Sequence, residues 1–324
     1  MKISFIDLYA GIGGMRLGFE LACKDLNHKP QCVFSSEWDK WCQETYKDNF
    51  NEVPHGDISK IVENDINIIK KHDVLMAGFP CQPFSNAGLK KGFNDTRGTA
   101  FHDLRSIIEA KRPKAFILEN VKGLRSHDKG RTLNIILEVL RDDLSYFVPD
   151  PKILNSKDFG LPQNRERIFI VGLKESMFNF QLVNIPKVPT KVKDILEKKS
   201  VTEDYKISTR LNKSHRRRKI EHKKNNRGFG FSLKKPSDSH TNTLSARYYK
   251  DGSEILIDQK ELDRRPRKLT PRECARLQGY PEDFIVDAVS DVQAYKQFGN
   301  SVSVPVIHAI AAEMLKFETK HSKN

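Results

Sequence analysis

The chain has 324 residues, of which 38% are hydrophobic, so it can bury a large core and exceeds the usual size of one small domain. Its 56 Lys and Arg outnumber its 42 Asp and Glu, and the net charge of +14 favours a polyanionic partner such as nucleic acid over an acidic small molecule. No basic-then-apolar leader follows Met1 and no apolar run is long enough to cross a bilayer. We therefore expect a soluble cytoplasmic protein without a membrane partner.

The cysteines give no sign of a metal or disulfide framework. There are five, an odd number, and none forms a C-x-x-C pair, so we predict no metal site. Four of them lie in apolar or helical surroundings, as small buried side chains do. Cys81 is the exception, because it follows a short apolar run and a proline.

The first half of the chain alternates β-rich runs with stretches of helical periodicity. This alternation predicts an α/β fold in which a mostly parallel sheet carries helices on both faces. The predicted strands are 2–8, 32–37, 73–79 and 115–121, completed by runs at 151–160 and 167–174. The predicted helices include one that opens in the glycines after Tyr9, and others at 38–50, 104–111 and 132–144.

The composition changes in the second half. Residues 206–227 contain ten Lys or Arg and one acid, a local net charge of +9. The Gly, Ser, Thr and aromatic residues that follow, with a hairpin signal at Asp251-Gly252, predict an irregular β-containing domain up to about residue 265.

Capping signals mark one later helix. Thr270, Pro271 and Glu273 at the start, and Gly279 at the end, predict a helix over 271–278. After a linker, a final helix that begins near Pro305 has an apolar face that needs the core of the sheet domain. The expected division is a catalytic domain at 1–175, a small domain at 176–290 and a returning segment at 291–324.

A glycine turn after the first predicted strand suits a nucleotide-like ligand. Arg16 occupies the third glycine position of the dinucleotide pattern, which points to a ligand without a pyrophosphate, such as S-adenosylmethionine. Glu37 lies at the end of the second predicted strand, where it can accept hydrogen bonds from ribose hydroxyls. Asp57 follows a third predicted strand and can accept a hydrogen bond from an adenine amino group. The alternatives are a solvent-facing Glu37 and an Asp57 that only caps a helix.

Cys81 and Glu119 each follow a predicted strand, and ligands bind outside the carboxyl ends of parallel strands. A thiolate nucleophile beside a carboxyl group suits covalent catalysis. The alternative is a packed cysteine and a glutamate that caps a helix.

Eight stretches between Asp7 and Met314 together resemble the DNA cytosine-5 methyltransferases of bacterial restriction-modification systems. They are DLYAGIGGMRLGFE, SEWDKWCQETY, GDIS, GFPCQPFSNAG, ENVKGL, QNRERIFIVG, LTPRECARLQGYP and QFGNSVSVP. The resemblance implies a Rossmann-like S-adenosylmethionine-dependent methyltransferase sheet with a smaller target-recognition domain, in a bacterial cytoplasmic enzyme.

The resemblance implies a role for each catalytic residue. Cys81 would add to carbon 6 of a flipped cytosine, and Glu119 would deliver a proton to ring nitrogen 3. Arg165 would hold the base near its O2 edge, Arg97 would support that edge or a phosphate, and Arg167 would be structural.

The resemblance also implies which residues contact the cofactor. They are Tyr9, Gly11, Gly13, Gly14, Glu37, Trp38, Asp57, Pro80, Asn300 and Ser301. Trp38 as plain core and Asn300 as a turn cap are the alternatives.

Double-stranded DNA is the expected partner of a monomer, with a cognate restriction endonuclease that acts separately. The stretch 84–98 reads as a lid over the flipped base, or alternatively as an ordinary surface loop. The basic run is expected to contact phosphates, with a solvated loop as the alternative. The predicted DNA contacts are Ser85, Arg216, Arg217, Arg218, Lys219 and Thr243. An RNA (transfer-RNA) cytosine methyltransferase and a DNA-binding regulator are the rival functions.

Overall fold

The computed structural model describes residues 1–80, 100–199, 201–226, 228, 230–259 and 265–321, with side chains up to Lys316. It divides into two compact units. The first comprises Met1–Leu154, Glu166–Ile185 and Val306–Asn324, and the second comprises Asn155–Arg165 and Pro186–Pro305. The domain boundaries expected from the sequence stay a prediction.

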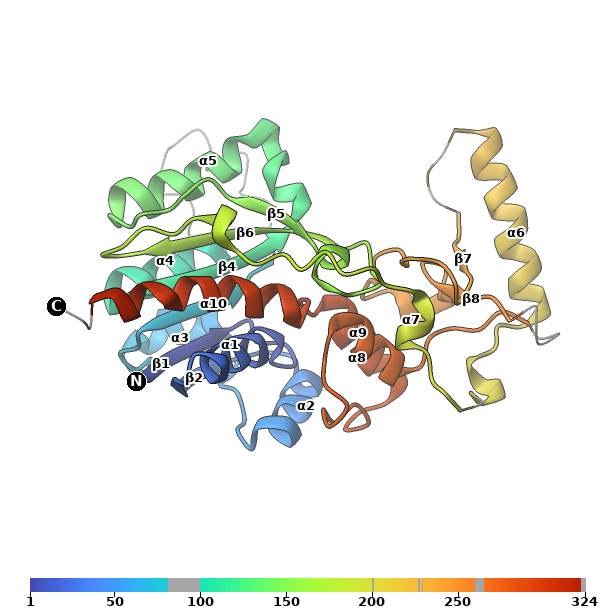
Figure 1. The fold of residues 1–324 in the computed structure, drawn as a ribbon, viewed down its shortest axis with the longest axis horizontal. Helices are drawn as coiled ribbons and strands as arrows, with labels where there is room; N and C mark the ends of the chain where they lie inside the picture. Colours follow the sequence, from blue (N-terminus) through green and yellow to red (C-terminus); the bar gives the residue numbers. More distant parts are fainter. Residues whose placement is uncertain (81–99, 200, 227, 229, 260–264, 322–324) are drawn as a thin grey trace. The chain divides into compact units, whose positions relative to one another are not determined.

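The first unit is built on a six-stranded sheet in the order β2-β1-β3-β4-β6-β5 (Figure 1). Strand β1 pairs in parallel with β2 and β3, and β3 pairs in parallel with β4, whereas β6 runs antiparallel to β4. The predicted α/β fold with a mostly parallel sheet is confirmed. The strands are β1 Lys2–Leu8, β2 Lys29–Ser36, β3 Val74–Gly78, β4 Ala115–Val121, β5 Lys152–Asn155 and β6 Glu166–Leu173.

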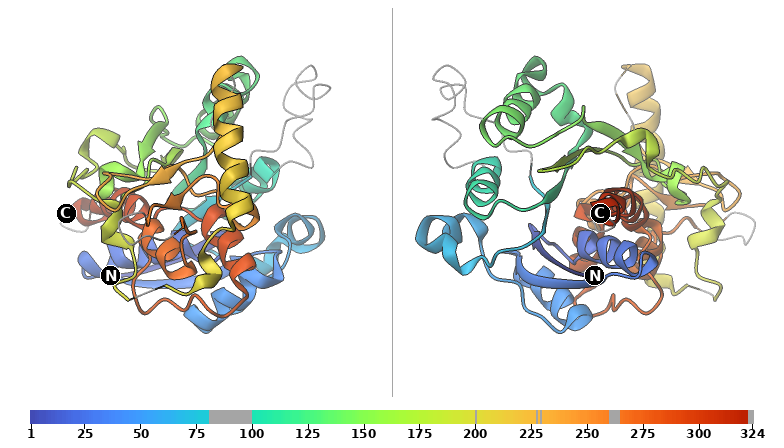
Figure 2. Two further views of the ribbon diagram at one scale, coloured as in Figure 1. Left: turned by 90° about the vertical axis from the view of Figure 1, so that its right-hand side faces the viewer. Right: turned by 60° about the vertical axis from the view of Figure 1, so that its left-hand side comes forward.

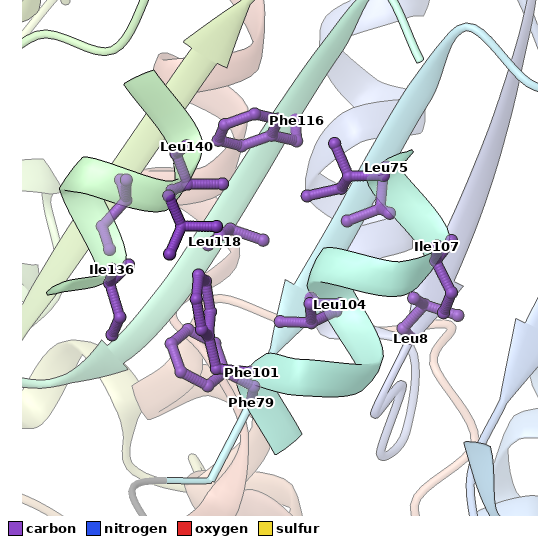
Figure 3. Close-up of a cluster of buried hydrophobic side chains, with 14 of the residues drawn as sticks. Leu8, Leu75, Phe79, Phe101, Leu104, Ile107, Phe116, Leu118, Ile136 and Leu140 are labelled. Atoms are coloured by element: carbon purple, nitrogen blue, oxygen red, sulfur yellow. The ribbon is translucent and has the colours of Figure 1, made fainter. Parts of the chain in front are cut away.

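Helices lie on both faces of this sheet. They are α1 Gly14–Asp25, α2 Lys40–Phe50, α3 Ile58–Asp65, α4 Ala100–Lys111, α5 Arg131–Glu138 and α10 Val304–His321. Figure 2 (right) shows α1 and α10 side by side on one face, where His308 Nε2 lies 2.8 Å from Asp25 Oδ2. On the opposite face, α4 and α5 pack on alternate strand residues and form a buried hydrophobic cluster (Figure 3). The cluster includes Leu8, Leu75, Phe101, Leu104, Phe116, Leu118, Ile136 and Leu140.

The second unit has little regular β structure. Its helices are α6 Thr209–Lys224, α7 Tyr248–Asp251, α8 Pro271–Gln278 and α9 Asp291–Asn300. Its two short strands, β7 Leu233–Lys234 and β8 Leu256–Ile257, pair in parallel. A small cluster of Ile207, Phe231 and Leu256 is buried beneath them.

Two locally encoded helices in this part of the chain match the prediction. Helix α8 has the predicted bounds, with a reciprocal capping box between Thr270 and Glu273 and a left-handed Gly279 at its end. Helix α10 begins at Val304, one residue before the expected Pro305. The expected linker between them contains a further helix, α9.

Three expectations were wrong. The strand predicted before Asp57 is a single bridge between Ser36 and His55. Gly252 does not turn a hairpin, because it ends helix α7 with φ of 63° and the flanking strands are parallel. The basic run expected to be irregular forms α6, which Ser208 caps by accepting from the backbone N–H of Leu211.

One stretch has the length and hydropathy of a membrane span, contrary to the expectation that none does. Asp291–Lys316 reaches a mean hydropathy of 1.2, but 67% of the apolar window is buried inside the fold. Burial of this kind is what a core helix shows, and the stretch comprises two separate helices, α9 and α10.

Candidate active site

Four parallel strands of the first unit end at one edge of the sheet, where ligands of open α/β sheets bind. The chain leaves β1 at Tyr9, β2 at Glu37 and β3 at Phe79, and Glu119 lies near the end of β4. Gly78 pairs with Glu119 in the ladder between β3 and β4. The topology therefore brings the predicted glycine turn, Glu37 and Glu119 to the same edge.

The turn after β1 needs glycine for conformation and for space. Gly11 and Gly13 have φ of 55° and 82°, and Tyr9 also has a positive φ of 54°. A Cβ at Gly13 would lie 2.2 Å from the ring of Phe50, whereas one at Gly11 would meet nothing within 4 Å. The backbone at Gly11 is thus open to a ligand. Gly14 is the first residue of α1.

Glu37 is fixed against this turn. One carboxylate oxygen accepts from the N–H of Gly11 at 2.8 Å and the other from the N–H of Asp39 at 2.8 Å. Burial raises the pKa of Glu37, and these backbone hydrogen bonds counteract the rise. The alternative of a solvent-facing Glu37 is wrong, since only 8% of the residue is exposed.

Trp38, the next residue, is 75% exposed, so the alternative that it is plain core is also wrong. An exposed indole beside a fixed carboxylate is an unusual surface feature that suits a flat ring as a ligand.

Arg16, which replaces the third glycine, points away from the turn. Its guanidinium hydrogen-bonds Tyr46 at 3.1 Å and pairs with Glu20 and Glu52, each at 2.8 Å. It also stacks over Phe50, 4.4 Å from the ring centre. The side chain thus ties α1 to α2 instead of allowing the close helix packing that a third glycine permits.

Asp57 caps α3, as the simpler reading of the sequence has it. Its carboxylate accepts from the N–H of Ser59 at 3.0 Å and remains partly exposed. The neighbouring Asp103 in the first turn of α4 is buried and accepts from the Ser59 hydroxyl at 2.5 Å. Nothing in the sequence singles out Asp103, because an acidic residue in a first helical turn is an ordinary feature.

Glu119 is paired with Arg167. Arg167 Nε lies 3.1 Å from Glu119 Oε1, and the two side chains are 19% and 11% exposed. The pair exists because β6 is antiparallel to β4, so the start of β6 meets the carboxyl end of β4 and Arg167 is opposite Val121. Among the described residues, Nη1 of Arg167 donates to the Glu166 carbonyl and Nη2 has no partner.

Arg165 has different surroundings in the second unit. Its guanidinium donates to the carbonyl oxygens of Leu244 at 3.0 Å, Gly299 at 3.3 Å and Ser301 at 2.5 Å, and only 2% of the residue is exposed. The structure thus shows that Arg167, expected to be structural, contacts the carboxyl group of Glu119, while the base contact expected of Arg165 stays a prediction. Arg165 is bound to backbone, and Arg167 faces the carboxyl group.

The other predicted contacts of the second unit lie near this arginine. Thr243 donates from its hydroxyl to the Asn164 carbonyl at 2.6 Å. Ser301 shares a hydrogen bond of 2.7 Å with the Tyr280 hydroxyl, and Asn300 is exposed at the end of α9. The simpler reading of Asn300 as a turn residue is compatible with this position.

Three predicted residues lie outside the described residues. They are Cys81, Ser85 and Arg97, and the stretch 84–98, the predicted lid, lies outside them too. Pro80, exposed, is the last described residue before them. The Phe79 carbonyl accepts from Asn120 Nδ2 at 3.0 Å, which ties the end of β3 to the end of β4.

Helix α6 attaches to the second unit by one narrow edge. His215 is 1% exposed and stacks on Phe231 with ring centres 5.5 Å apart. Its Nδ1 lies 2.9 Å from an Arg218 nitrogen and its Nε2 3.2 Å from the Asp251 carbonyl. Because arginine only donates, Nδ1 must accept and His215 is the neutral Nε2–H tautomer.

The four DNA contacts predicted on α6 therefore fall on two of its faces. Arg218 faces inward, pairing with Asp251 at 3.4 Å, which argues against a phosphate contact. Arg216, Arg217 and Lys219 are exposed. The alternative of a solvated loop is wrong for the described residues, since the run is helical.

Comparisons with known proteins agree on one family. The family model described as C-5 cytosine-specific DNA methylase matches residues 3–316. The chain is 56% identical to the Type II methyltransferase M1.ScrFI of Lactococcus lactis subsp. cremoris, over 99% of this chain and 80% of that protein. It is 55% identical to the Type II methyltransferase M.SsoII of Shigella sonnei, over 97% and 80%. The solved structure of the S. pombe Dnmt2 methyltransferase has a TM-score of 0.78, covers 98% of this chain and 99% of its own, and at 21% identity supports the fold alone.

Proposed function

Because the chain belongs to the C-5 cytosine-specific DNA methylase family, we propose that it methylates one cytosine of a short sequence in double-stranded DNA and so protects host DNA from a separate restriction endonuclease. The chain is a DNA (cytosine-5)-methyltransferase, and S-adenosylmethionine is its methyl donor. The observation that carries the finer proposal is the Glu119–Arg167 pair, at the sheet edge that also bears the glycine turn.

The residues present fit this cofactor. The open backbone at Gly11, the fixed carboxylate of Glu37 and the exposed indole of Trp38 suit an amino-acid part, a ribose and an adenine. The remaining cofactor contacts expected in the first unit are Tyr9, Gly13, Gly14, Asp57 and Pro80. Those expected in the second unit are Asn300 and Ser301. The bound cofactor supplies an electrophilic methyl group for carbon 5 of the base.

Cys81 is the proposed nucleophile. Its thiolate forms a bond to carbon 6 of cytosine, and the electron pair of the carbon 5–carbon 6 double bond shifts so that carbon 5 becomes nucleophilic. After carbon 5 is methylated, its proton is lost to a base, the double bond re-forms and the thiolate leaves. A thiol suits both addition and departure.

Glu119 and Arg167 would handle the other side of the ring. As carbon 6 is attacked, negative charge builds on ring nitrogen 3, and a proton held at the Glu119 carboxyl lowers that cost. Arg167 orients this carboxyl group through Nε. Its Nη2 would donate a hydrogen bond to O2 of the base. Arg165 would instead fix backbone in the second unit, and Arg97 would support the base edge or a phosphate.

The target base must leave the duplex, at a cost of roughly a few kcal/mol. Ser85 and Thr243 are proposed to contact the backbone of the flipped nucleotide. Arg216, Arg217 and Lys219 on α6 are proposed to contact phosphates, which position the protein without specifying sequence.

Trapping with 5-fluorocytosine tests this function. Random-sequence DNA duplexes that carry 5-fluorocytosine, incubated with the chain and S-adenosylmethionine, should give a complex that survives denaturing electrophoresis, because fluorine cannot leave as a proton does. Cys81→Ser should form none, whereas the matched control Cys32→Ser, at a thiol whose pKa burial raises to about 12, should trap like the native chain.

The same assay separates the rival functions. Trapping on 5-fluorocytosine transfer RNA but not on duplex DNA would establish the RNA methyltransferase and overturn the proposal. Sequence-specific DNA binding without any covalent complex would establish the regulator.

A further inference from the structure

One buried carboxyl group joins three segments around the cofactor side of the first unit. Asp103 is 6% exposed, in the first turn of α4. Its Oδ2 accepts from the Ser59 hydroxyl at 2.5 Å. Burial raises the pKa of Tyr9, and the negative charge of Asp103 lies close enough to the Tyr9 hydroxyl to raise it further. The Tyr9 hydroxyl donates to the carbonyl oxygen of Ala100, the first residue of α4, at 3.3 Å.

These contacts reach two residues that are proposed to bind the cofactor. Tyr9 begins the glycine turn with a left-handed backbone, a conformation that costs a non-glycine residue free energy and needs support from its surroundings. Ser59 lies in the first turn of α3, and its N–H is the group that the Asp57 carboxylate caps. A hydroxyl and an amide of one residue thus connect Asp103 to Asp57.

The sheet does not position these segments by itself. Tyr9 lies beyond the end of β1, and the segment before Asp57 has one bridge instead of a strand. Backbone hydrogen bonds of Ala10 and His55 to β2 hold both segments at the sheet edge. The side-chain contacts of Tyr9 and Ser59 refine where the Tyr9 ring and the Asp57 carboxylate lie. Asp103 lies next to both of these hydroxyl groups.

We propose that Asp103 is a positioning residue of the cofactor site, which holds Tyr9 and the start of α3 in the geometry that binds S-adenosylmethionine. This inference rests on the proposed cofactor site. Asp103 acts through Tyr9 and Ser59, and does not touch the ligand.

A carboxyl group suits this role better than its amide. The Ser59 hydroxyl donates to Asp103 and the Tyr9 hydroxyl lies near the same carboxyl group, and both carboxyl oxygens can accept. An asparagine side chain at this position would keep one accepting oxygen and present an NH₂ group to the other hydroxyl in a buried place, where an unmade hydrogen bond is costly. Burial raises the pKa of Asp103 and the two hydroxyl groups lower it, as expected for a carboxyl group in polar surroundings.

The test measures binding of S-adenosylhomocysteine, the cofactor without its methyl group, to the full chain by calorimetry. Asp103→Asn should raise the Kd at least about fivefold, as expected for the loss of roughly 1 kcal/mol of positioning. The affinity of Asp103→Asn for a DNA duplex should stay within about twofold of the native value. Distant sites that share no partners affect each other by no more than about this much. The matched control is Glu109→Gln, an exposed acid on the same helix that should leave the Kd unchanged.

A double-mutant cycle distinguishes positioning from general weakening. If Asp103 acts through Tyr9, then Tyr9→Phe combined with Asp103→Asn should raise the Kd little more than either change alone. If the fold-increases in Kd of the two single variants multiply in the double variant, the proposal is overturned. An Asp103→Asn chain with an unchanged Kd and only a lower unfolding midpoint would overturn it as well. Should Asp103→Asn fail to fold, Ser59→Ala and Tyr9→Phe carry the same test, and unchanged Kd values in both would contradict it.

The outcome also separates this inference from the proposed function. A native chain that did not bind S-adenosylhomocysteine would contradict the cofactor site itself. Native binding with an unaffected Asp103→Asn variant would contradict the role of Asp103 alone.

Discussion

The exposed face of α6 gives a quantitative prediction about DNA binding. Arg216, Arg217 and Lys219 are exposed, and their replacement by Gln removes three positive charges. The replacement keeps His215 and Arg218, and loses the contact of Lys219 Nζ over the Phe231 ring, at 5.2 Å from the ring centre. Arg217 lies 3.7 Å from Glu221, a weak exposed pair that a phosphate can replace. The triple variant should therefore fold like the native chain.

The size of the effect follows from counterion release. Each phosphate neutralised contributes about 0.9 to the slope of log affinity against log salt, so three contacts contribute about 2.7. Between about 50 mM and about 200 mM salt the native affinity should therefore fall about 40-fold more than that of the variant.

Fluorescence anisotropy of a labelled duplex across this salt range measures both slopes. A charge-matched control replaces three exposed lysines of the first unit, Lys2, Lys24 and Lys60, and should leave the slope nearly native. Equal slopes for the native chain and the α6 variant would refute the phosphate role of this face.

Three further predictions concern the fold and the active site. Arg167→Gln should fold normally but lose at least about 100-fold in the rate of single-turnover methyl transfer. Arg165→Gln should instead lose about 3 kcal/mol of unfolding free energy, because buried carbonyls are left unpaired. The opposite pattern would support the roles expected from the sequence. Gly13→Ala should cost at least about 2 kcal/mol, because it combines a left-handed backbone with a clash against Phe50, and near-native urea denaturation would contradict this. Burial lowers the pKa of His215 below its ordinary 6.5, so the unfolded chain binds a proton at a higher pH than the folded chain does. The free energy of unfolding should therefore fall as pH drops below about 6.5. His215→Gln should flatten that decline, and a decline as steep as the native one would show that other groups cause it.

Local signals predicted some elements of this fold to the residue. Helix α8 is specified by its cap, its first-turn proline and its terminal glycine, all of which act within one or two turns of the chain. The apolar runs of the central strands likewise predict β3 and β4 closely, because each is buried on both faces.

Helix α6 shows where that reasoning fails. Its sequence carries no long apolar stripe, since the buried or partly buried residues of the helix are Leu211, Asn212, His215, Arg218 and His222, and only the first is aliphatic. A search for hydrophobic periodicity therefore misses it, although Arg and Lys are good helix formers and Ser208 is a good cap. His215 buries an aromatic ring where the pattern shows only a polar residue.

The two arginines of QNRER show a different limit. Both lie in one motif two residues apart, and which of them meets Glu119 depends on the antiparallel direction of β6. A mostly parallel sheet does not predict that direction. The glycine turn and Glu37 were predictable because their positions follow from strand ends alone.

Bisulfite sequencing tests the central claim most directly. A bacterial host without cytosine methylation would express the native chain or its Cys81→Ser variant, and DNA and RNA from the same cells would be converted in parallel. The native chain should leave one cytosine of a single short DNA sequence unconverted throughout the genome, and the variant none. Complete conversion of the DNA by both chains, or protected cytosines in RNA alone, would contradict a DNA cytosine-5 methyltransferase that acts through Cys81.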